Sequence, residues 1–290
     1  MPTIVKQSPE TVLGGRRHSR GSHHRARMIG CSERWIILLG LVLVFLCGCA
    51  AIEHKPTRPS KLKLPQSKVV ASLRIPAVDP QGVVAVRDSL WLLDARGPEL
   101  LQVDPKSGKK LSSVRIRVES PRGLTWDGTY FWCGDNKTNT VHQLDRSTGM
   151  VVRSLRVPID GIAEAAVLED IVFDGKQLWL AYAAGYSSRI QRIDTQTGEV
   201  VQSMFANCHP RGITTDGKRL WVVCYNRGQR PSVLSVRTIM DDPGKMNASR
   251  VFLSRTPGSE PTGIAFDGQY LWLTDKKLKT VQKIVIPSPN

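Results

Sequence analysis

The chain has 290 residues, with 41 lysines and arginines against 25 aspartates and glutamates, so its formal net charge is +16 at pH 7. A basic balance suits partners that carry negative charge, such as anionic lipid headgroups, glycans or acidic ligands. The cations are scattered over repeated turns and the sequence contains no recognisable nucleic-acid-binding module, so we expect no nucleic-acid partner.

The N-terminal segment differs from the rest of the chain and is predicted to direct export. Residues 1–34 are rich in Arg and His, and Trp35–Leu46 forms an uninterrupted apolar run of 12 residues. At about 1.5 Å per residue this run is too short to cross a bilayer core of about 30 Å. We therefore expect residues 1–48 to be a signal peptide with a long basic lead-in, and Met28 to be a more usual start than Met1. The alternative is a signal anchor that is never cleaved.

The apolar run ends in Leu46-Cys47-Gly48-Cys49, which resembles a bacterial lipobox. The resemblance implies that Cys49 becomes the lipid-bearing first residue of the mature protein. It also implies a location in the bacterial cell envelope, anchored to a membrane on its periplasmic or cell-surface side. Residues 49–66 hold three prolines and several cations, so we expect a flexible tether after the lipidated cysteine.

Five similar stretches follow, and each contains a tryptophan. They read VRDSLWLLD, DGTYFWCGD, DGKQLWLAY, DGKRLWVVC and DGQYLWLTD, with tryptophans at Trp91, Trp132, Trp179, Trp221 and Trp272. The tryptophans are 41, 47, 42 and 51 residues apart, which is the period of a β-propeller blade. In each copy we expect an innermost strand, a two-residue Asp-Gly hairpin turn and a second strand that carries the tryptophan. The repeated tryptophans are predicted to pack between adjacent blades rather than to bind ligand.

Third strands are predicted from LLQVDPKSG, VHQLDRSTG and IQRIDTQTG, and fourth strands from segments such as MVVRSLRVP. The fifth copy lacks a fourth strand. Lys68–Pro76, KVVASLRIP, matches MVVRSLRVP closely, so we expect this N-terminal strand to complete the C-terminal blade and close the ring. The predicted fold class is all-β, with a five-bladed β-propeller over residues 67–290.

Through GIxxDGxxLWxxD and IDxxTGxVxxS the chain resembles the broad bacterial propeller group that includes NHL, YVTN and streptogramin-lyase-like repeats. The resemblance covers about residues 67–287 and implies the fold. It leaves function open, because such repeats occur in lyases, lactonases, scaffolds and binding proteins alike.

The middle residue of the PxG motif that opens each copy is predicted to face the propeller axis. These five residues are Gln81, Arg122, Glu169, Arg211 and Thr262, and blade three replaces Pro and Gly to read Leu168-Glu169-Asp170. Two arginines could clamp a carboxylate or phosphate, with Glu169 or Asp170 as the balancing charge. The alternative is a solvated ring of ion pairs that stabilises a narrow channel.

Three enlarged connections are predicted to share one face and one side of the ring, which favours a ligand or partner there. They are residues 158–170, Tyr182–Arg189 and Cys224–Ser232, and the candidate contacts on them are Tyr182, Tyr186, Asn226 and Arg227. The alternative is neutral drift in loops that tolerate insertion.

Cys208 and Cys224 are predicted to form a disulfide, because a hairpin turned at Asp216-Gly217 puts residue 209 opposite residue 224. Cys208-His209 with Cys224 would alternatively be a partial metal site that lacks a fourth ligand. Cys133 is expected to be a small buried hydrophobic residue.

Taken together, these patterns predict a binding or assembly module for an anionic small molecule or an envelope protein, with no cofactor and no metal. Glycosidase chemistry needs carboxylates that converge on the channel, and few are present. The ring is too basic for a lactonase-like metal site. The alternative is a hydrolase or lyase that uses His209 with Glu169 or Asp170 at the channel mouth.

Overall fold

The computed structural model describes residues 64–287 except 159–165, 227–228, 239–250 and 259. All of them belong to one compact unit, Lys61–Asn290. The expected signal peptide, Met28 and Cys49 lie outside the described residues. Within the described part of the chain, no helix has the length and apolar character needed to cross a membrane.

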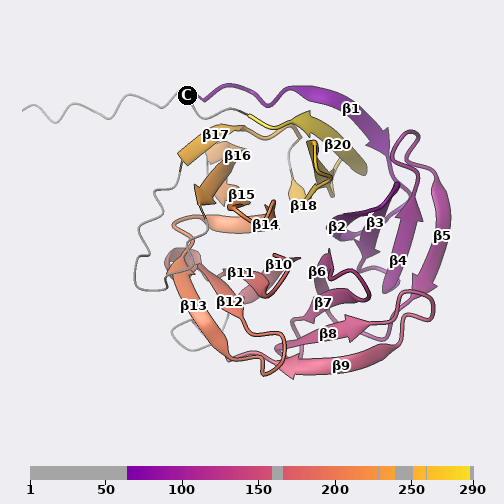
Figure 1. The fold of residues 1–290 in the computed structure, drawn as a ribbon. Helices are drawn as coiled ribbons and strands as arrows, with labels where there is room; N and C mark the ends of the chain where they lie inside the picture. Colours follow the sequence, from indigo (N-terminus) through magenta and orange to yellow (C-terminus); the bar gives the residue numbers. More distant parts are fainter. Residues whose placement is uncertain (1–63, 159–165, 227–228, 239–250, 259, 288–290) are drawn as a thin grey trace, which may run out of the picture. The chain divides into compact units, whose positions relative to one another are not determined.

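The described chain forms five four-stranded antiparallel sheets arranged around an axis (Figure 1). Blades one to four each contain four consecutive strands. Blade one contains β2 (Pro80–Val86), β3 (Ser89–Asp94), β4 (Glu99–Val103) and β5 (Lys110–Arg115), and blade two contains β6 (Pro121–Trp126), β7 (Phe131–Asp135), β8 (Thr140–Leu144) and β9 (Val151–Arg156). Blade three contains β10 (Val167–Phe173), β11 (Leu178–Ala183), β12 (Arg189–Ile193) and β13 (Val200–Phe205), with the short 3-10 helix η1 (Gly185–Ser187) between β11 and β12. Blade four contains β14 (His209–Thr215), β15 (Arg219–Asn226), β16 (Gln229–Thr238) and β17 (Val251–Arg255). Blade five contains β18 (Pro261–Phe266), β19 (Tyr270–Asp275), β20 (Thr280–Val285) and β1 (Val69–Arg74). The prediction of a five-bladed propeller closed by an N-terminal strand is confirmed.

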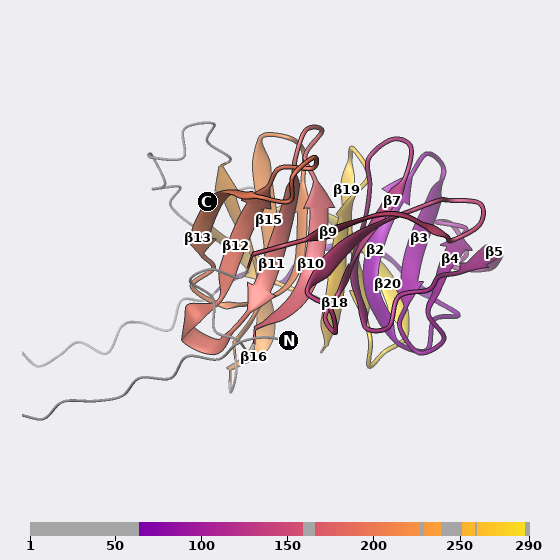
Figure 2. The ribbon, with the colours of Figure 1, turned by 90° about the horizontal axis from the view of Figure 1, so that it is seen from below.

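The strands run between the two faces of the ring (Figure 2). Each blade's first strand lies nearest the axis, and its fourth strand lies at the circumference (Figure 1). We call the face at which the first strands begin the mouth face and the opposite one the turn face. The turns between first and second strands lie on the turn face, because antiparallel neighbours reverse direction there.

Residues 65–74 contact two blades. In blade five, β1 pairs with β20. Just before β1, Ser67 N donates to Arg255 O at 2.9 Å, and Arg255 N donates to Pro65 O at 2.8 Å. Ser67 Oγ also lies 2.7 Å from Ser254 Oγ. The edge of β17 in blade four is therefore covered. Leu64 also packs against the cluster of buried residues between blades three and four.

The aspartate of the repeated Asp-Gly motif has a different role from the one predicted. Asp127 N donates to Tyr130 O, so the two central turn residues are Gly128 and Thr129 rather than Asp-Gly. Gly128 has φ of +102°, which glycine adopts without steric cost. Asp127 Oδ1 accepts from the N–H groups of Thr129 and Tyr130, and Oδ2 accepts from Trp132 Nε1 at 2.7 Å. The aspartate thus links the turn to the buried tryptophan.

The same bond recurs at 2.8 Å in blade three and 2.7 Å in blade five, from Trp179 to Asp174 and from Trp272 to Asp267. Blade one departs from it, because Val86 stands in the aspartate's place. Trp91 Nε1 is accordingly buried without a hydrogen-bond partner among the described residues. All five tryptophans are buried in the clusters that join blades, as the repeat predicted.

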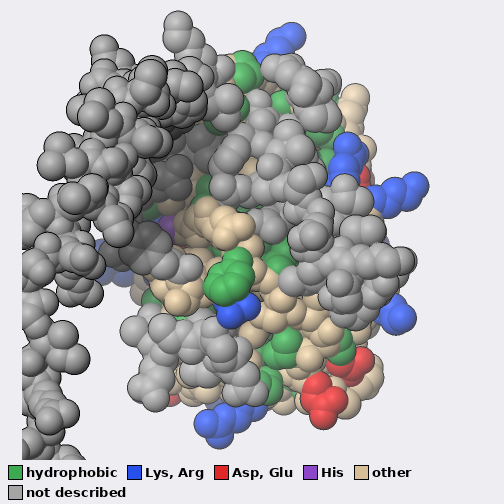
Figure 3. Space-filling view, turned by 90° about the vertical axis from the view of Figure 1, so that its left-hand side faces the viewer, with side chains coloured by type: hydrophobic (Ala, Val, Ile, Leu, Met, Phe, Trp, Pro, Cys, Tyr) green, Lys and Arg blue, Asp and Glu red, His purple; other side chains and the backbone are tan. Residues whose placement is uncertain are grey.

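Charged side chains do not form one basic patch on the face shown in Figure 3, where the visible Lys and Arg lie apart from one another, most of them near the edge of the view and one close to its centre. Some cations instead cover aromatic rings. The guanidinium of Arg189 lies 3.9 Å from the ring centroid of the exposed Phe205. The described part of this face therefore offers no continuous basic groove.

The turns between the third and fourth strands of blades one, two and three each contain an aspartate whose pKa is lowered by hydrogen bonds. Asp145 Oδ1 accepts hydrogen bonds from the hydroxyl and N–H groups of Ser147 and Thr148. The Ser147 hydroxyl and the other donors lower the pKa of Asp145 from 3.8 to about 2. Because the folded-state pKa is the lower one, the stabilisation is complete above pH 3.8 and is lost as the pH falls through 2.

Asp145→Asn should therefore remove part of the pH dependence of stability. The difference in free energy of unfolding between wild type and this variant should shrink between pH 5 and pH 2, measured by urea unfolding. Asp88→Asn is the control, because Asp88 is exposed and its side chain makes no hydrogen bond in the described residues. A difference that stays constant with pH would contradict the assignment to Asp145.

Candidate functional site at the channel mouth

Each first strand has an irregular register near its start. The shifts lie between Pro80 and Val83, Arg122 and Thr125, Leu168 and Asp170, Pro210 and Gly212, and Pro261 and Gly263. Such bulges turn a side chain away from the regular alternation of a strand. They coincide with the PxG segments, so the five residues predicted to face the axis lie at or beside them.

Glu169 is the centre of the charged cluster at the mouth. Arg211 Nη1 donates to both of its carboxylate oxygens, at 3.3 and 3.1 Å. Arg122 Nη1 lies 3.7 Å from Oε2, and His209 Nε2 lies 3.5 Å from Oε1. Glu169 is 5 % exposed, whereas the side chains of Arg122 and Arg211 are 26 % and 27 % exposed. One buried carboxylate is thus shared by two half-buried guanidinium groups.

A polar chain extends the cluster toward blade five. Arg122 Nη1 donates to Gln81 Oε1, and Gln81 Nε2 donates to Asp79 Oδ1 at 2.5 Å. Lys276 Nζ lies 2.7 Å from the same Asp79 oxygen. Burial alone would raise the pKa of Asp79, but hydrogen bonds from Lys276 and Gln81 and the nearby positive charges lower it below its ordinary value. The fifth predicted member, Thr262, is buried and its hydroxyl lies 3.3 Å from that of Thr274 in its own blade.

Tyr225 forms an aromatic wall beside the cluster and was not identified from the sequence. The Arg211 guanidinium lies 5.6 Å from its ring centroid, and the His209 ring meets it edge-on at 6.3 Å. Tyr225 lies opposite His209 in the pairing of β14 with β15. The sequence marked the loop that begins at Cys224, but a correct register was needed to place Tyr225 beside the histidine.

Asp170 does not line the mouth. It is 1 % exposed, and its oxygens accept from the backbone N–H groups of Ile171 and Ile213, both at 2.9 Å. Its carboxylate is therefore occupied inside the ring, and Glu169 alone balances the two arginines. This corrects the expectation that either acidic residue could orient them or act with His209.

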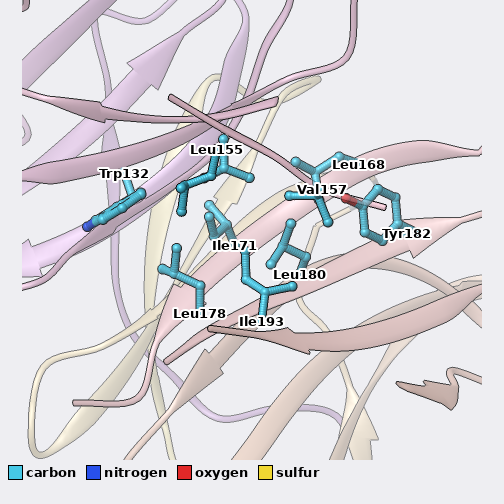
Figure 4. Packing of buried hydrophobic residues seen from close by; sticks show 10 residues of the cluster. Trp132, Leu155, Val157, Leu168, Ile171, Leu178, Leu180, Tyr182 and Ile193 are labelled. Carbon is cyan, nitrogen blue, oxygen red and sulfur yellow. The ribbon is translucent and has the colours of Figure 1, made fainter. Parts of the chain in front are cut away.

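The predicted loop contacts are placed only in part. Tyr182 is 4 % exposed and packs in the core between blades two and three (Figure 4), so it does not reach the mouth. Burial also raises the pKa of its hydroxyl. Tyr186 lies in η1 and Asn226 ends β15, but their side chains are outside the described parts of the structure, as are Arg227 and residues 159–165.

Cys208 and Cys224 form a disulfide whose Cα atoms are 5.6 Å apart. Cys224 occupies the position in its blade that an aspartate occupies in other blades. In blade two, Asp135 accepts from the N–H groups of Glu119 and Ser120, both at 3.2 Å, and so holds the connection that leads into the first strand. Blade four fixes the equivalent connection covalently. Because the two sulfur atoms are joined to each other, the partial metal site considered from the sequence has no thiolates.

The register behind the disulfide differs from the one predicted. His209 lies opposite Tyr225 and Pro210 opposite Cys224, whereas the sequence placed residue 209 opposite 224. Two opposite displacements produce this pairing. The turn is one residue later than expected, which moves the partner of residue 209 from 224 to 226, and the bulge at Arg211 moves it back by one residue to Tyr225. More generally, no group of three or more His, Cys, Asp or Glu residues in the described chain is arranged to hold a metal ion.

Comparison with known proteins supports the fold. No protein-family model and no curated protein matches the sequence. Similar solved structures include a glutaminyl cyclase from Myxococcus xanthus, with 11 % identity over 76 % of this chain and 97 % of that one and a TM-score of 0.51. They also include a gluconolactonase from Xanthomonas campestris (16 % identity, 77 % and 82 % coverage, TM-score 0.47) and the hydrazine synthase of Kuenenia stuttgartiensis (18 %, 72 % and 77 %, 0.45). At these identities the likeness shows a β-propeller fold alone.

Proposed function

We propose that the protein is a lipid-anchored propeller of the bacterial cell envelope that binds an anionic ligand, or an acidic group on an envelope protein, at the channel mouth. The observation that carries the proposal is the sharing of Glu169 by Arg122 and Arg211. Within the described residues, the hydrogen bonds and ion pairs of both arginines use Nη1 only. The remaining N–H groups of each guanidinium are left to bind a carboxylate or phosphate.

The surroundings favour an anion that carries an apolar part. Two guanidinium charges face one carboxylate, so the cluster retains positive charge, and the neighbouring Lys276–Asp79 pair does not change that balance. Tyr225 offers a ring face beside Arg211. The envelope location rests on a separate observation, the lipobox-like sequence that ends at Cys49.

The test measures citrate and inorganic phosphate binding by isothermal titration calorimetry at low ionic strength. Arg122→Ala with Arg211→Ala should weaken binding by about tenfold or more, because both cations are lost. Glu169→Gln should tighten it, because the internal anion no longer competes for the guanidinium groups. Arg219→Ala is the matched control, since Arg219 pairs with Asp216 on the turn face.

Unchanged binding in the double variant would exclude the clamp, as would the absence of saturable binding to the wild-type protein. Weaker binding that is equal in the Arg219→Ala control would show only that net charge matters. That outcome would also count against a site at the mouth.

A catalytic role is the second candidate. His209 Nε2 lies 3.5 Å from Glu169 Oε1, which is the kind of pairing that general acid–base catalysis uses. On this hypothesis the protein is a hydrolase or lyase that acts at the mouth with His209 and Glu169. A specific divalent-metal requirement, seen as thermal stabilisation by that metal, would favour catalysis over simple binding.

A further inference from the structure

The propeller axis narrows to backbone contacts just inside the mouth. At the level of Asp170, the four other first strands carry glycine: Gly82, Gly123, Gly212 and Gly263. A Cβ atom added at Gly82 would lie 2.7 Å from Leu124 N, and one at Gly123 would lie 2.6 Å from Ile171 N. Cβ atoms at Gly212 and Gly263 would lie 3.1 Å from the backbone of the neighbouring blade. Glycine is needed here because adjacent strands touch.

Asp170 supplies the one side chain at this level of the axis. Its Oδ1 accepts from Ile171 N and its Oδ2 from Ile213 N, both at 2.9 Å. The backbone N–H groups of Ile264 and Leu124 also act on the carboxylate, and each lowers its pKa. These four donors come from blades two, three, four and five. A single carboxylate therefore connects four of the five blades.

The donor set fits a carboxylate anion. A carboxylate accepts at about four lone-pair positions and donates nothing, which matches four converging N–H groups. Without it, each of these buried N–H groups would remain unpaired, which destabilises the folded state. Converging backbone N–H groups are also a recurrent form of anion site. Burial raises the pKa of Asp170, and the backbone hydrogen bonds oppose that rise by favouring the ionised form.

We propose that the propeller axis is an anion-binding cradle for one small carboxylate, built from N–H groups of four blades and occupied by the chain's own Asp170. The carboxylate fastens the blades to each other and closes the channel. On its far side lies an axial cavity of about 150 Å³, lined by residues that include Leu124, Ile171, Ile213 and Ile264. The mouth is accordingly a blind site, which a ligand enters and leaves by the same face.

Asp170→Gly tests the cradle by chemical rescue with sodium formate. The variant removes the carboxylate, keeps all four N–H donors and matches the residue of the other blades. We expect its Tm to fall by roughly 5–10 °C, and formate to restore part of that loss in a saturable manner. Val172→Ala is the control, because it loses a buried methyl contact from the same strand but no anion.

Asp170→Asn tests whether Asp170 is an anion or a protonated carboxyl group in the folded protein. Its amide occupies the same space but directs an NH₂ group at N–H donors, so we expect a loss of stability that formate does not restore. If Asp170 were protonated, this variant would be about as stable as the wild type. That result would overturn the proposal, as would an equal effect of formate on wild type, Asp170→Gly and Val172→Ala.

Hydrogen exchange of the wild-type protein provides a test that needs no variant to fold. The amide protons of Leu124, Ile171, Ile213 and Ile264 should be among the slowest to exchange, because their donors are buried and bonded at the junction of four blades. Rapid exchange at these four amides would overturn the proposal.

Discussion

Replacing Trp179 by alanine is expected to lower the free energy of unfolding by about 3–5 kcal/mol. The side chain is fully buried at the interface of blades three and four, where it packs with Val172, Ile190 and Leu220. Its removal leaves a cavity that two rigid sheets cannot close. The measurement is equilibrium unfolding in urea with the slope of the transition checked, because a changed slope would mean that blades unfold separately.

Two phenylalanine variants distinguish the stabilisation that comes from packing of the ring from the stabilisation that comes from its hydrogen bond. Trp179→Phe keeps an aromatic ring but loses the 2.8 Å bond from Nε1 to Asp174. Trp91→Phe is the matched control, because Trp91 Nε1 has no hydrogen-bond partner in the described chain. The Trp179 variant should lose about 1 kcal/mol more than the Trp91 variant. Equal losses would show that the aspartate–tryptophan bond contributes nothing beyond the packing of the ring.

Removing the disulfide is expected to lower the free energy of unfolding by about 3 kcal/mol. Cys208 and Cys224 are separated by 16 residues, so the bond closes a loop of moderate length in the unfolded chain. The change is Cys208→Ala with Cys224→Ala, followed by urea unfolding. Wild-type protein treated with dithiothreitol should approach the same stability. Unchanged stability in the double variant would contradict a stabilising role.

A second variant replaces Cys224 by the aspartate that other blades have at the same position. Asp135 and Asp94 hold the equivalent connections of blades two and one through backbone N–H groups. Cys208→Ala with Cys224→Asp should therefore regain part of the stability that the double alanine variant loses. If the aspartate variant is no more stable than the alanine variant, the disulfide and the aspartate are not equivalent devices.

The architecture could be predicted because the same sequence pattern recurs in each blade. A short strand, a glycine-containing turn and a buried tryptophan are local features, so their spacing counts the blades directly. Closure was predictable for a related reason: the fifth repeat lacks its fourth strand, and Lys68–Pro76 has the missing pattern. The same logic found Arg122, Glu169 and Arg211, because they occupy one position of the repeat.

The remaining features depend on geometry that residue patterns do not contain. The sequence placed Asp170 beside Glu169 at the mouth, but the close approach of the neighbouring glycines directs its carboxylate into the axis. Tyr182 was assigned to an enlarged loop from the sequence, yet it lies within β11 and its side chain is buried in the core. Tyr225 was missed because a bulge of one residue decides which side chain lies opposite His209.

Closure by the N-terminal strand also fixes the order in which the molecule can be completed. The ribosome makes β1 first among the described strands and β20 last, so β1 has no partner until the whole propeller has been synthesised. Pairings between such distant segments are slow to form. Until then β19 lacks its outer neighbours and the ring stays open. A chain that stops short of Thr280 would leave β1 without a partner, so ring closure distinguishes a finished chain from a truncated one.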